Sequence, residues 1–228
     1  MKLSILIPVY NEKNTINEII QKVKSVNISK EIIIIDDGSI DGTKDILKNL
    51  NDLEVKVIFQ DKNQGKGNCI RTGIKYVTGD IVAIQDADLE YDPNDFIELV
   101  KPIMNGKTKV VYGTRFPKDK KRPSIFKNKF YLANKILTIT ANVLYNANIT
   151  DEATCYKIFD AELIKGIDLT CNRFEFCPEV TAKVRKKDYK ITELPISYHP
   201  RSENEGKKIK YRDGFEALWT LIKFRFVK

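Results

Sequence analysis

Histidine and clustered cysteine are what this chain of 228 residues most conspicuously lacks. His199 is its one histidine, and its four cysteines are scattered and form no C-x-x-C pair. A structural zinc site needs about four such ligands at close spacing, so we expect none. Buried thiols in a reducing cytoplasm are the simpler interpretation of Cys69, Cys155, Cys171 and Cys177.

Long apolar runs are missing as well. No uncharged apolar segment approaches the ~20 residues that a membrane-spanning helix needs. Residues 136–150 carry no charge, but Thr and Asn interrupt them. The short apolar run at the N-terminus ends at Pro8, so we expect no signal peptide. A chain of this length with 42% hydrophobic residues suits one domain with a sizeable core.

Negative charge is in deficit, with 31 Asp and Glu against 39 Lys and Arg, a net charge of +8. This balance favours anionic partners, which include nucleic acid, phosphate-bearing substrates and acidic membranes. The sequence has no basic, aromatic-interleaved motif such as an RNP box or a zinc finger, so we expect no nucleic-acid partner. A solvated, lysine-rich surface explains most of the lysines.

Apolar and amphipathic segments alternate along the first half of the chain. Strand patterns at 3–9, 31–35, 55–59, 80–84 and 109–112 alternate with helical patterns at 14–25, before Leu50, at 66–77 and after Pro93. This alternation predicts an α/β fold with a mainly parallel sheet flanked by helices. The second half is less regular, with expected helices at 124–145, 178–187 and 211–227 and expected strands at 154–159 and 190–194.

We expect residues 1–210 to form one catalytic domain. Residues 211–228 then form a C-terminal amphipathic helix with Phe215, Leu218, Trp219, Ile222 and Phe226 at helical spacing. That helix belongs either to the same domain or to a tail at a membrane interface.

Three polar clusters, PVYNE, DDGS and QDADLE, follow three of the expected strands. Ligands of parallel α/β sheets bind outside the carboxyl ends of the strands. The clusters are therefore expected to converge on one site. Asp37 can reach a ribose hydroxyl or a base N–H there, and Gly38 leaves the backbone free to approach a ligand.

Asp86, Asp88 and Glu90 place three carboxylates within five residues. In an extended chain alternate side chains share a face, so all three are expected to point one way. Such like charges repel one another unless a cation lies between them. Carboxylate oxygens suit Mg²⁺ or Mn²⁺, and alone the motif fits a solvated turn equally well, but the neighbouring clusters favour a metal. Positive charge around bound phosphates can come from Lys66, Arg71, Arg115, Arg201, Lys207 and Lys208.

Four segments in fixed order, SILIPVYNE, IIIIDDGSIDGT, NQGKGNCIRTGIKYVTGD and IQDADLEYDP, resemble family 2 glycosyltransferases of the GT-A fold. Within that family the chain is similar to the dolichol-phosphate mannosyltransferase and polyprenyl-phosphate glycosyltransferase branch. VVYGTRF, TCYKIF, NRFEF, PEVTAKVRKK and PISYHPRSENEGKKIKYRDGFEAL continue the resemblance over nearly the whole chain.

The resemblance implies a role for each matching residue on the donor side. Pro8, Tyr10 and Glu12 match the nucleotide-contacting segment, and Asp37 matches a base or ribose contact. The D-x-D motif, which binds the donor diphosphate through Mg²⁺ or Mn²⁺, is matched by Asp86, Ala87 and Asp88. Glu90 matches a further metal position, where the mannosyltransferases usually have Gln. Arg201, Lys207 and Lys208 match a loop that closes over the donor.

On the acceptor side, Arg115 in GTRF matches a basic residue that meets the acceptor phosphate, and Lys127 and Lys129 are candidates for a second one. Asp88, Arg115 and Arg201 are the expected catalytic residues. The implied reaction moves one sugar from a nucleotide sugar of the GDP-mannose or UDP-glucose type to a polyprenyl or dolichyl monophosphate. Because that phosphate is already an anion, it needs no general base and attacks the anomeric carbon with inversion.

Three rival functions stay open. A glycosyltransferase acting on a glycan hydroxyl would need a general base, and Asp151 and Glu152 are the nearest candidates. A nucleotidyltransferase would show a G-x-G-T-R loop near the first strand, and PVYNE is not that loop. A non-catalytic module would bind nucleic acid through its positive charge.

A lipid acceptor must be met at a bilayer. We therefore expect a cytoplasmic protein, peripheral at the cytoplasmic face of a membrane, with the helices 124–145 and 211–227 at the surface. A separate membrane-anchoring partner is the alternative.

Overall fold

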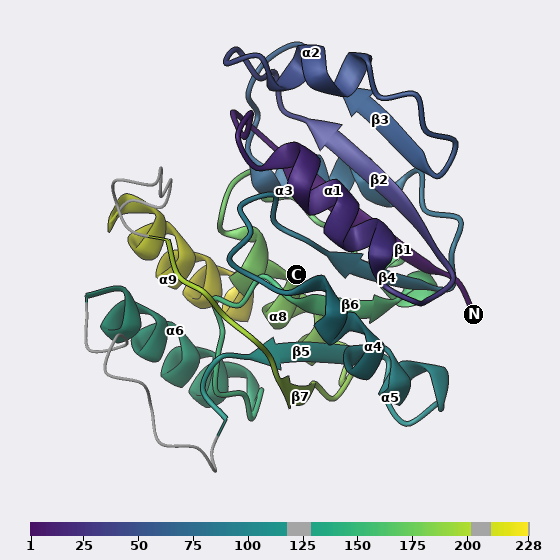
Figure 1. The fold of residues 1–228 in the computed structure, drawn as a ribbon. Coiled ribbons are helices and arrows are strands. Elements are labelled where there is room, and N and C mark those ends of the chain that lie inside the picture. Colours follow the sequence, from purple (N-terminus) through teal and green to yellow (C-terminus); the bar gives the residue numbers. More distant parts are fainter. Residues whose placement is uncertain (118–128, 202–210, 228) are drawn as a thin grey trace.

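A seven-stranded sheet organises the protein, whose computed structural model describes residues 1–117, 129–201 and 211–227 (Figure 1). The strand order is β3-β2-β1-β4-β6-β5-β7. The strands are β1 (Leu3–Val9), β2 (Lys30–Asp36), β3 (Val55–Phe59), β4 (Ile81–Ile84), β5 (Val110–Thr114), β6 (Lys157–Asp160) and β7 (Thr192–Pro195).

Parallel pairing dominates this sheet, as predicted. β1 pairs in parallel with β2 and β4, β2 with β3, and β5 with β7. β6 alone among the described strands runs against its neighbours, because it pairs antiparallel with both β4 and β5. The carboxyl ends of β1, β2, β4 and β5 therefore open on the same edge of the sheet.

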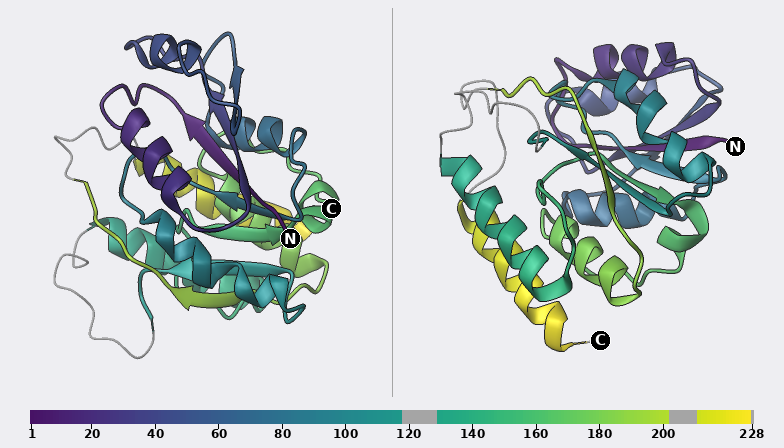
Figure 2. Two further views of the ribbon diagram at one scale, coloured as in Figure 1. Left: turned by 45° about the vertical axis from the view of Figure 1, so that its right-hand side comes forward. Right: turned by 90° about the horizontal axis from the view of Figure 1, so that it is seen from below.

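Helices cover both faces of the sheet, with α1 on one side and α3 and α8 on the other (Figure 2). The helices are α1 (Ile16–Ser25), α2 (Thr43–Lys48), α3 (Lys66–Ile74), α4 (Phe96–Leu99), α5 (Lys101–Met104), α6 (Lys129–Tyr145), α7 (Ala161–Lys165), α8 (Phe176–Lys186) and α9 (Tyr211–Phe226).

The expected helix after Pro93 is interrupted. A 3₁₀ turn over Pro93–Asp95 leads into α4, and one residue, Val100, separates α4 from α5. Pro102 lies in the first turn of α5, where the missing proline N–H breaks the helical hydrogen-bond pattern least. The short α7 was not predicted, because five residues show no periodicity. It begins where the Asp160 side chain accepts a hydrogen bond from the Leu163 N–H at 2.9 Å.

The central strands form the core. Ile5, Leu6 and Ile7 in β1 and Ile34 and Ile35 in β2 are completely buried. A strand buried on both faces reads as a continuous β-branched run, which is why 31–35 was recognisable as a strand. Their rigid packing fixes the positions of the polar residues that follow each strand.

The C-terminal helix α9 packs against α6 and α8. Ala217, Leu221 and Phe224 are buried on its inner side, and the Tyr145 hydroxyl of α6 donates to the Leu221 carbonyl at 2.5 Å. The division into a domain at 1–210 and a helix at 211–228 stays a prediction. None of the helices in the described ranges is long and apolar enough to cross a bilayer.

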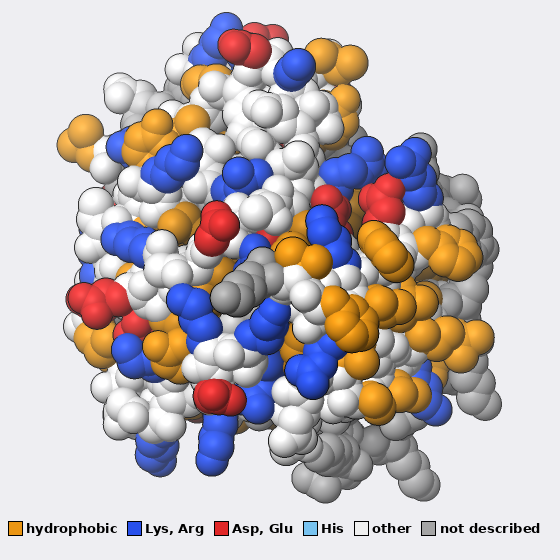
Figure 3. Space-filling view, turned by 180° about the vertical axis from the view of Figure 1, so that it is seen from behind, with side chains coloured by type: hydrophobic (Ala, Val, Ile, Leu, Met, Phe, Trp, Pro, Cys, Tyr) orange, Lys and Arg blue, Asp and Glu red, His pale blue; other side chains and the backbone are white. Residues whose placement is uncertain are grey.

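Lys and Arg side chains are spread over the face of the molecule seen in Figure 3 rather than gathered into one basic patch. This distribution agrees with a solvated, lysine-rich surface. Hydrophobic side chains gather on the right of the same view, on the side where α6 and α9 lie.

Candidate active site

The residues that follow β1, β2 and β4 meet at one edge of the sheet, as predicted. The Asp37 N–H, just after β2, donates to the Val9 carbonyl of β1 at 2.8 Å. The Arg201 guanidinium links the other two clusters, since it lies 3.4 Å from Glu12 and 3.2 Å from Asp88. Pro8 and Tyr10 are half-buried at the same edge, and Ala87 is buried.

The acidic segment after β4 turns instead of staying extended. Leu89 has a positive φ of 63°, and the Glu90 N–H donates to Asp88 Oδ1 at 3.1 Å. The strand-like backbone assumed for Asp86, Asp88 and Glu90 is therefore wrong. Asp88 and Glu90 nevertheless both face the Arg201 guanidinium, whose nitrogens lie 3.2 and 3.9 Å from their carboxylate oxygens. In the described ranges, no three Asp, Glu, His or Cys side chains form a ready-made metal cluster.

Glu90 braces the segment that carries Arg201. Its carboxylate accepts from the Tyr198 hydroxyl at 3.0 Å and from the Arg201 N–H at 2.9 Å. Its backbone carbonyl accepts from the His199 N–H at 2.8 Å, while the His199 side chain is exposed. These contacts give Glu90 a positioning role; its predicted role as a metal ligand stays a prediction.

The two aspartates of the D-x-D motif each have a basic partner. Lys66 Nζ lies 2.5 Å from Asp86 Oδ1, and Arg201 Nη2 lies 3.2 Å from Asp88 Oδ2. Burial, together with the nearby Asp86 and Glu90 carboxylates, raises the pKa of Asp88 to about 7. A carboxylate in this setting is stabilised by positive charge, and its hard oxygen atoms suit Mg²⁺ or Mn²⁺. Asp86 and Asp88 thus fit a divalent cation.

Lys66 has a more specific position than the sequence indicated, where it was only one of six basic residues that could supply positive charge around phosphates. Burial lowers the pKa of Lys66, but the Asp86 carboxylate outweighs that effect and holds the pKa well above its ordinary value. Gly65 before it has a φ of 99°, and a Cβ there would lie 2.5 Å from the Asn172 carbonyl oxygen. Only glycine fits this close approach, which starts α3 and directs Lys66 inward.

Asp37 closes a loop in this structure. Its two oxygens accept from the N–H groups of Gln64 and Gly65 at 2.8 Å each, and the residue is 2% exposed. The neighbouring Gly38 makes room for the chain itself, because a Cβ there would lie 2.8 Å from the backbone of Lys62. The role of Asp37 as a ribose or base contact stays a prediction.

Arg115 follows β5 and is held by a buried carboxylate. Its Nε and Nη2 donate to Asp151 Oδ2 and Oδ1 at 2.7 and 2.8 Å, a bidentate pair, and Asn134 of α6 donates to the same Oδ1 at 2.9 Å. The Tyr198 ring centroid lies 4.9 Å from the guanidinium carbon. Such a pair fixes the plane of the guanidinium group.

Neither candidate base is accessible to a substrate hydroxyl. Asp151 is completely buried and bound to Arg115 and Asn134. Glu152 is also completely buried, which raises its pKa to about 7 in spite of the nearby Lys157. A general base must reach the proton that it removes, and a fully buried carboxylate does not reach a substrate hydroxyl.

The other predicted basic residues divide into two groups. We call the sheet edge that carries Asp86, Asp88 and Glu90 the acidic edge. Arg71 donates to the Thr170 carbonyl at 3.1 Å and to Asn172 Oδ1 at 2.9 Å, so it holds a loop in place rather than facing the acidic edge. Lys127, Lys207 and Lys208 lie outside the described residues. Lys129 opens α6, and its side chain lies outside the described part of the chain.

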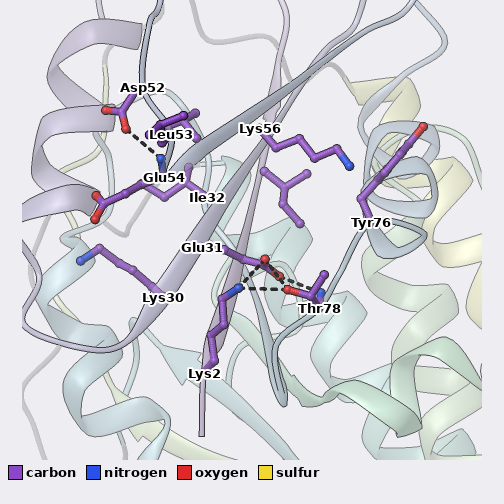
Figure 4. Close-up of a pocket in the computed structure, with 12 residues that line it drawn as sticks. Lys2, Lys30, Glu31, Ile32, Asp52, Leu53, Glu54, Lys56, Tyr76 and Thr78 are labelled. Atoms are coloured by element: carbon purple, nitrogen blue, oxygen red, sulfur yellow. Dashed lines mark hydrogen bonds and ion pairs between the residues drawn. The ribbon is translucent and has the colours of Figure 1, made fainter.

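A hollow of about 570 Å³ lies at the opposite end of the strands, lined by residues that include Lys2, Glu31, Glu54 and Tyr76 (Figure 4). None of the acidic-edge residues lines it. Within it, Glu31 accepts from Lys2 Nζ at 2.8 Å and from the Thr78 hydroxyl and N–H at 2.5 and 2.7 Å. Glu31 thus connects the amino ends of β1 and β2 to the turn before β4.

Replacing Glu31 with Gln is expected to lower the free energy of unfolding at pH 7 by roughly 1.5–3 kcal/mol, the usual effect of losing hydrogen bonds to a charged group. Burial alone raises the pKa of Glu31, but the hydrogen bonds from Lys2, Ser4 and Thr78 outweigh it and lower the pKa to about 2. The stabilisation is therefore present above about pH 4.5 and is lost as the pH falls toward 2. Urea unfolding between pH 2 and 7 measures it. The exposed Glu54→Gln is the matched control, and equal losses in both variants would contradict the assignment.

Comparison with known proteins gives a consistent result. A model of "Glycosyl transferase family 2" matches residues 4–167. Over 96% of this chain, 28% of residues are identical to a dolichol-phosphate mannosyltransferase of Pyrococcus furiosus. Over 98% of this chain, 29% are identical to a UDP-N-acetylglucosamine–dolichyl-phosphate N-acetylglucosaminyltransferase of Methanococcus voltae. The chain spans 62% of the length of the Pyrococcus protein, 96% of the Methanococcus protein and about half (53%) of a further archaeal relative.

The fold has a close structural neighbour. Glucosyl-3-phosphoglycerate synthase of Mycobacterium tuberculosis, crystallised with Mn²⁺, UDP and phosphoglyceric acid, superimposes with a TM-score of 0.74. The match covers 100% of this chain and 79% of that one at 16% sequence identity. This likeness confirms the GT-A fold predicted from the sequence.

Proposed function

The chain belongs to glycosyl transferase family 2, and from that premise we propose that it transfers one sugar, with inversion, from a nucleoside diphosphate sugar to a polyprenyl or dolichyl monophosphate. The two archaeal relatives support the acceptor class, since both names specify dolichyl phosphate. The donor is of the GDP-mannose or UDP-glucose type.

The engagement of Asp151 by Arg115 is the observation that carries this proposal. A hydroxyl acceptor is a weak nucleophile and needs a base, whereas a monophosphate is already an anion. At this site the nearby carboxylate holds a guanidinium group in place instead of standing free. A guanidinium group whose plane is already fixed suits a phosphate. The same observation disfavours a glycan-hydroxyl acceptor.

On the donor side, Asp86 and Asp88 would hold the Mg²⁺ or Mn²⁺. When bound, such an ion neutralises the diphosphate as it leaves. Lys66 keeps Asp86 oriented, and Glu90 positions the backbone of Arg201. Arg201 is within reach of the acidic edge, so its guanidinium group is placed to donate to the phosphates of the donor.

The reaction then depends on bringing two anions together. Lys66, Arg115 and Arg201 supply fixed positive charge around them, which lowers the electrostatic cost of that approach. The acceptor phosphate oxygen attacks the anomeric carbon from the side opposite to the leaving diphosphate, so the configuration inverts. Because the acceptor is a lipid, we propose that the enzyme acts at the cytoplasmic face of a membrane.

Transfer of labelled sugar tests the acceptor class. GDP-mannose and UDP-glucose are offered separately, with Mg²⁺ or Mn²⁺, to a polyprenyl monophosphate and to the matching polyprenol. Label entering the organic phase with the phosphate, and at least 100-fold less with the alcohol, is the expected result. Comparable transfer to the alcohol would return the hydroxyl-acceptor function to first place.

A further inference from the structure

The chain that follows β7 runs past both halves of the active site. Residues 196–201, called the connecting segment below, form an extended stretch that is yellow-green in Figure 1. At the start of this segment the Ile196 N–H donates to the carbonyl of Thr114, the last residue of β5, at 3.1 Å. At its end Arg201 Nη2 lies 3.2 Å from Asp88 Oδ2. One short stretch of chain therefore links the acceptor side of the site to the donor side.

Tyr198, in the middle of the connecting segment, contacts both sides. The guanidinium carbon of Arg115 lies 4.9 Å from the centroid of the tyrosine ring. The tyrosine hydroxyl donates to Glu90 Oε2 at 3.0 Å, and the other oxygen of that carboxylate, Oε1, accepts from the Arg201 N–H at 2.9 Å. The ring thus borders the acceptor-side arginine, and the hydroxyl shares a carboxylate with the donor-side arginine.

The backbone around Tyr198 is held on both sides. Before it, the Ser197 N–H donates to Asp95 Oδ2 at 2.7 Å. After it, the His199 N–H donates to the Glu90 carbonyl at 2.8 Å. A side chain whose own backbone is held in this way is itself fixed in position, so it can fix the position of the groups that it touches.

The reaction needs Arg115 and Arg201 at a fixed separation, although they come from distant parts of the chain. Each is proposed to hold one of two phosphate groups, and a misplacement of about 1 Å can lower a rate about 10²-fold. The pair with Asp151 fixes the plane of Arg115, and Glu90 fixes the backbone of Arg201. Tyr198 contacts both of these arrangements, which otherwise belong to separate elements of the fold.

We propose that Tyr198 is a positioning residue that sets the acceptor-side Arg115 and the donor-side Arg201 relative to each other. The ring acts on the acceptor side through its contact with the guanidinium group. The hydroxyl acts on the donor side through Glu90. The proposal deepens the lipid-phosphate function and rests on it for the assignment of the two arginines.

Two substitutions separate the hydroxyl from the ring. Tyr198→Phe removes the hydrogen bond to Glu90 and keeps the ring. It should weaken the binding of UDP or GDP with Mn²⁺ by about tenfold and leave the affinity for a short-chain, water-soluble polyprenyl phosphate unchanged. Tyr198→Leu also removes the ring, and it should in addition weaken the binding of that polyprenyl phosphate by about 5–30-fold. Calorimetric titration measures both affinities.

A further variant tests the route through the carboxylate. If the Tyr198 hydroxyl acts on Arg201 through Glu90, removing the hydroxyl has no effect once that carboxylate is gone. In a Glu90→Ala background, Tyr198→Phe should therefore change the nucleotide affinity by less than about twofold. A full, independent tenfold loss in the double variant would mean that the hydroxyl contacts the donor itself, and it would overturn the positioning role.

Tyr76 supplies the matched control, in the hollow at the other end of the strands (Figure 4). Lys56 Nζ lies 4.2 Å from the centroid of its ring, so this tyrosine makes a similar contact with a cation. Tyr76→Phe and Tyr76→Leu should both keep the two affinities of the wild type. Thermal unfolding shows whether each variant is folded, and if Tyr198→Leu is not, Tyr198→Phe decides, because it keeps the packing of the ring.

The pattern of losses separates this inference from the function on which it rests. An unchanged nucleotide affinity in Tyr198→Phe, or equal losses of nucleotide and polyprenyl phosphate affinity in that variant, would overturn the positioning role. A wild-type protein that binds both ligands and shows the expected losses in its variants, yet transfers no sugar to the polyprenyl phosphate, would sink the proposed reaction alone.

Discussion

Asp88→Asn is expected to lower kcat for sugar transfer by roughly 10³-fold or more, the largest effect of any single substitution in this site. Asp88 lies in the D-x-D turn, 3.2 Å from Arg201, and its carboxylate is one of two that would hold the divalent cation. The asparagine side chain keeps the shape of the aspartate side chain and removes its negative charge. Initial rates with saturating donor and acceptor measure the effect, and titration with Mn²⁺ in the presence of the nucleoside diphosphate measures the loss of metal affinity.

The thermal stability of the variant distinguishes a loss of catalytic activity from misfolding. Burial and neighbouring carboxylates raise the pKa of Asp88 to about 7, so its charged form opposes folding of the metal-free protein at neutral pH. Asp88→Asn is therefore expected to unfold at the same temperature as the wild type or higher. The exposed Asp61→Asn serves as the matched control with unchanged activity. Full activity in Asp88→Asn would contradict the assignment of the acidic edge.

Arg115→Lys is expected to lower kcat/KM for the acceptor by 10²–10³-fold while leaving the affinity for the nucleoside diphosphate unchanged. A lysine keeps the positive charge but cannot form the bidentate pair with Asp151, so the charge that we propose to meet the acceptor phosphate is no longer fixed in direction. Initial rates at varied acceptor concentration measure kcat/KM for the acceptor, and calorimetric titration measures the affinity for the nucleoside diphosphate.

The control for Arg115→Lys is Arg71→Lys, in which the arginine bonds only to loop oxygens. That variant should keep its kcat/KM for the acceptor. If Arg115→Lys instead weakened donor and acceptor binding equally, Arg115 would belong to the donor site and the acceptor assignment would be wrong.

The first half of the fold was predictable because its strands are apolar runs that alternate with amphipathic helical patterns. β1 and β3 begin and end where the sequence pattern placed them, since each apolar run is bounded by polar turn residues, although β1 is buried and β3 is partly exposed. The reversed direction of β6 was not predictable, because strand direction depends on pairing across distant segments. The sequence did not predict the short helix α7, because its N-terminal cap, Asp160, is recognisable only from its hydrogen bond to Leu163.

The residue types of the site were readable from the sequence, but their partners were not. Asp86 and Asp88 were identified from their spacing together with the neighbouring polar clusters and the family resemblance. Lys66 lies 20 residues before Asp86, and Asp151 lies 36 residues after Arg115. No local pattern links such residues. They meet because the folded chain brings the start of α3 and the segment before the antiparallel strand β6 to the edge where β4 and β5 end. For the same reason Asp151 was considered as a base, whereas the structure engages it with Arg115.

The structure of the product tests the central claim most directly. One- and two-dimensional NMR of the purified glycolipid, with ³¹P coupling, identifies the bond made to the anomeric carbon and its configuration. The account predicts a phosphodiester at that carbon, with a configuration opposite to that of the donor. A glycosidic bond to a hydroxyl, or a phosphodiester with the donor's configuration retained, would contradict it.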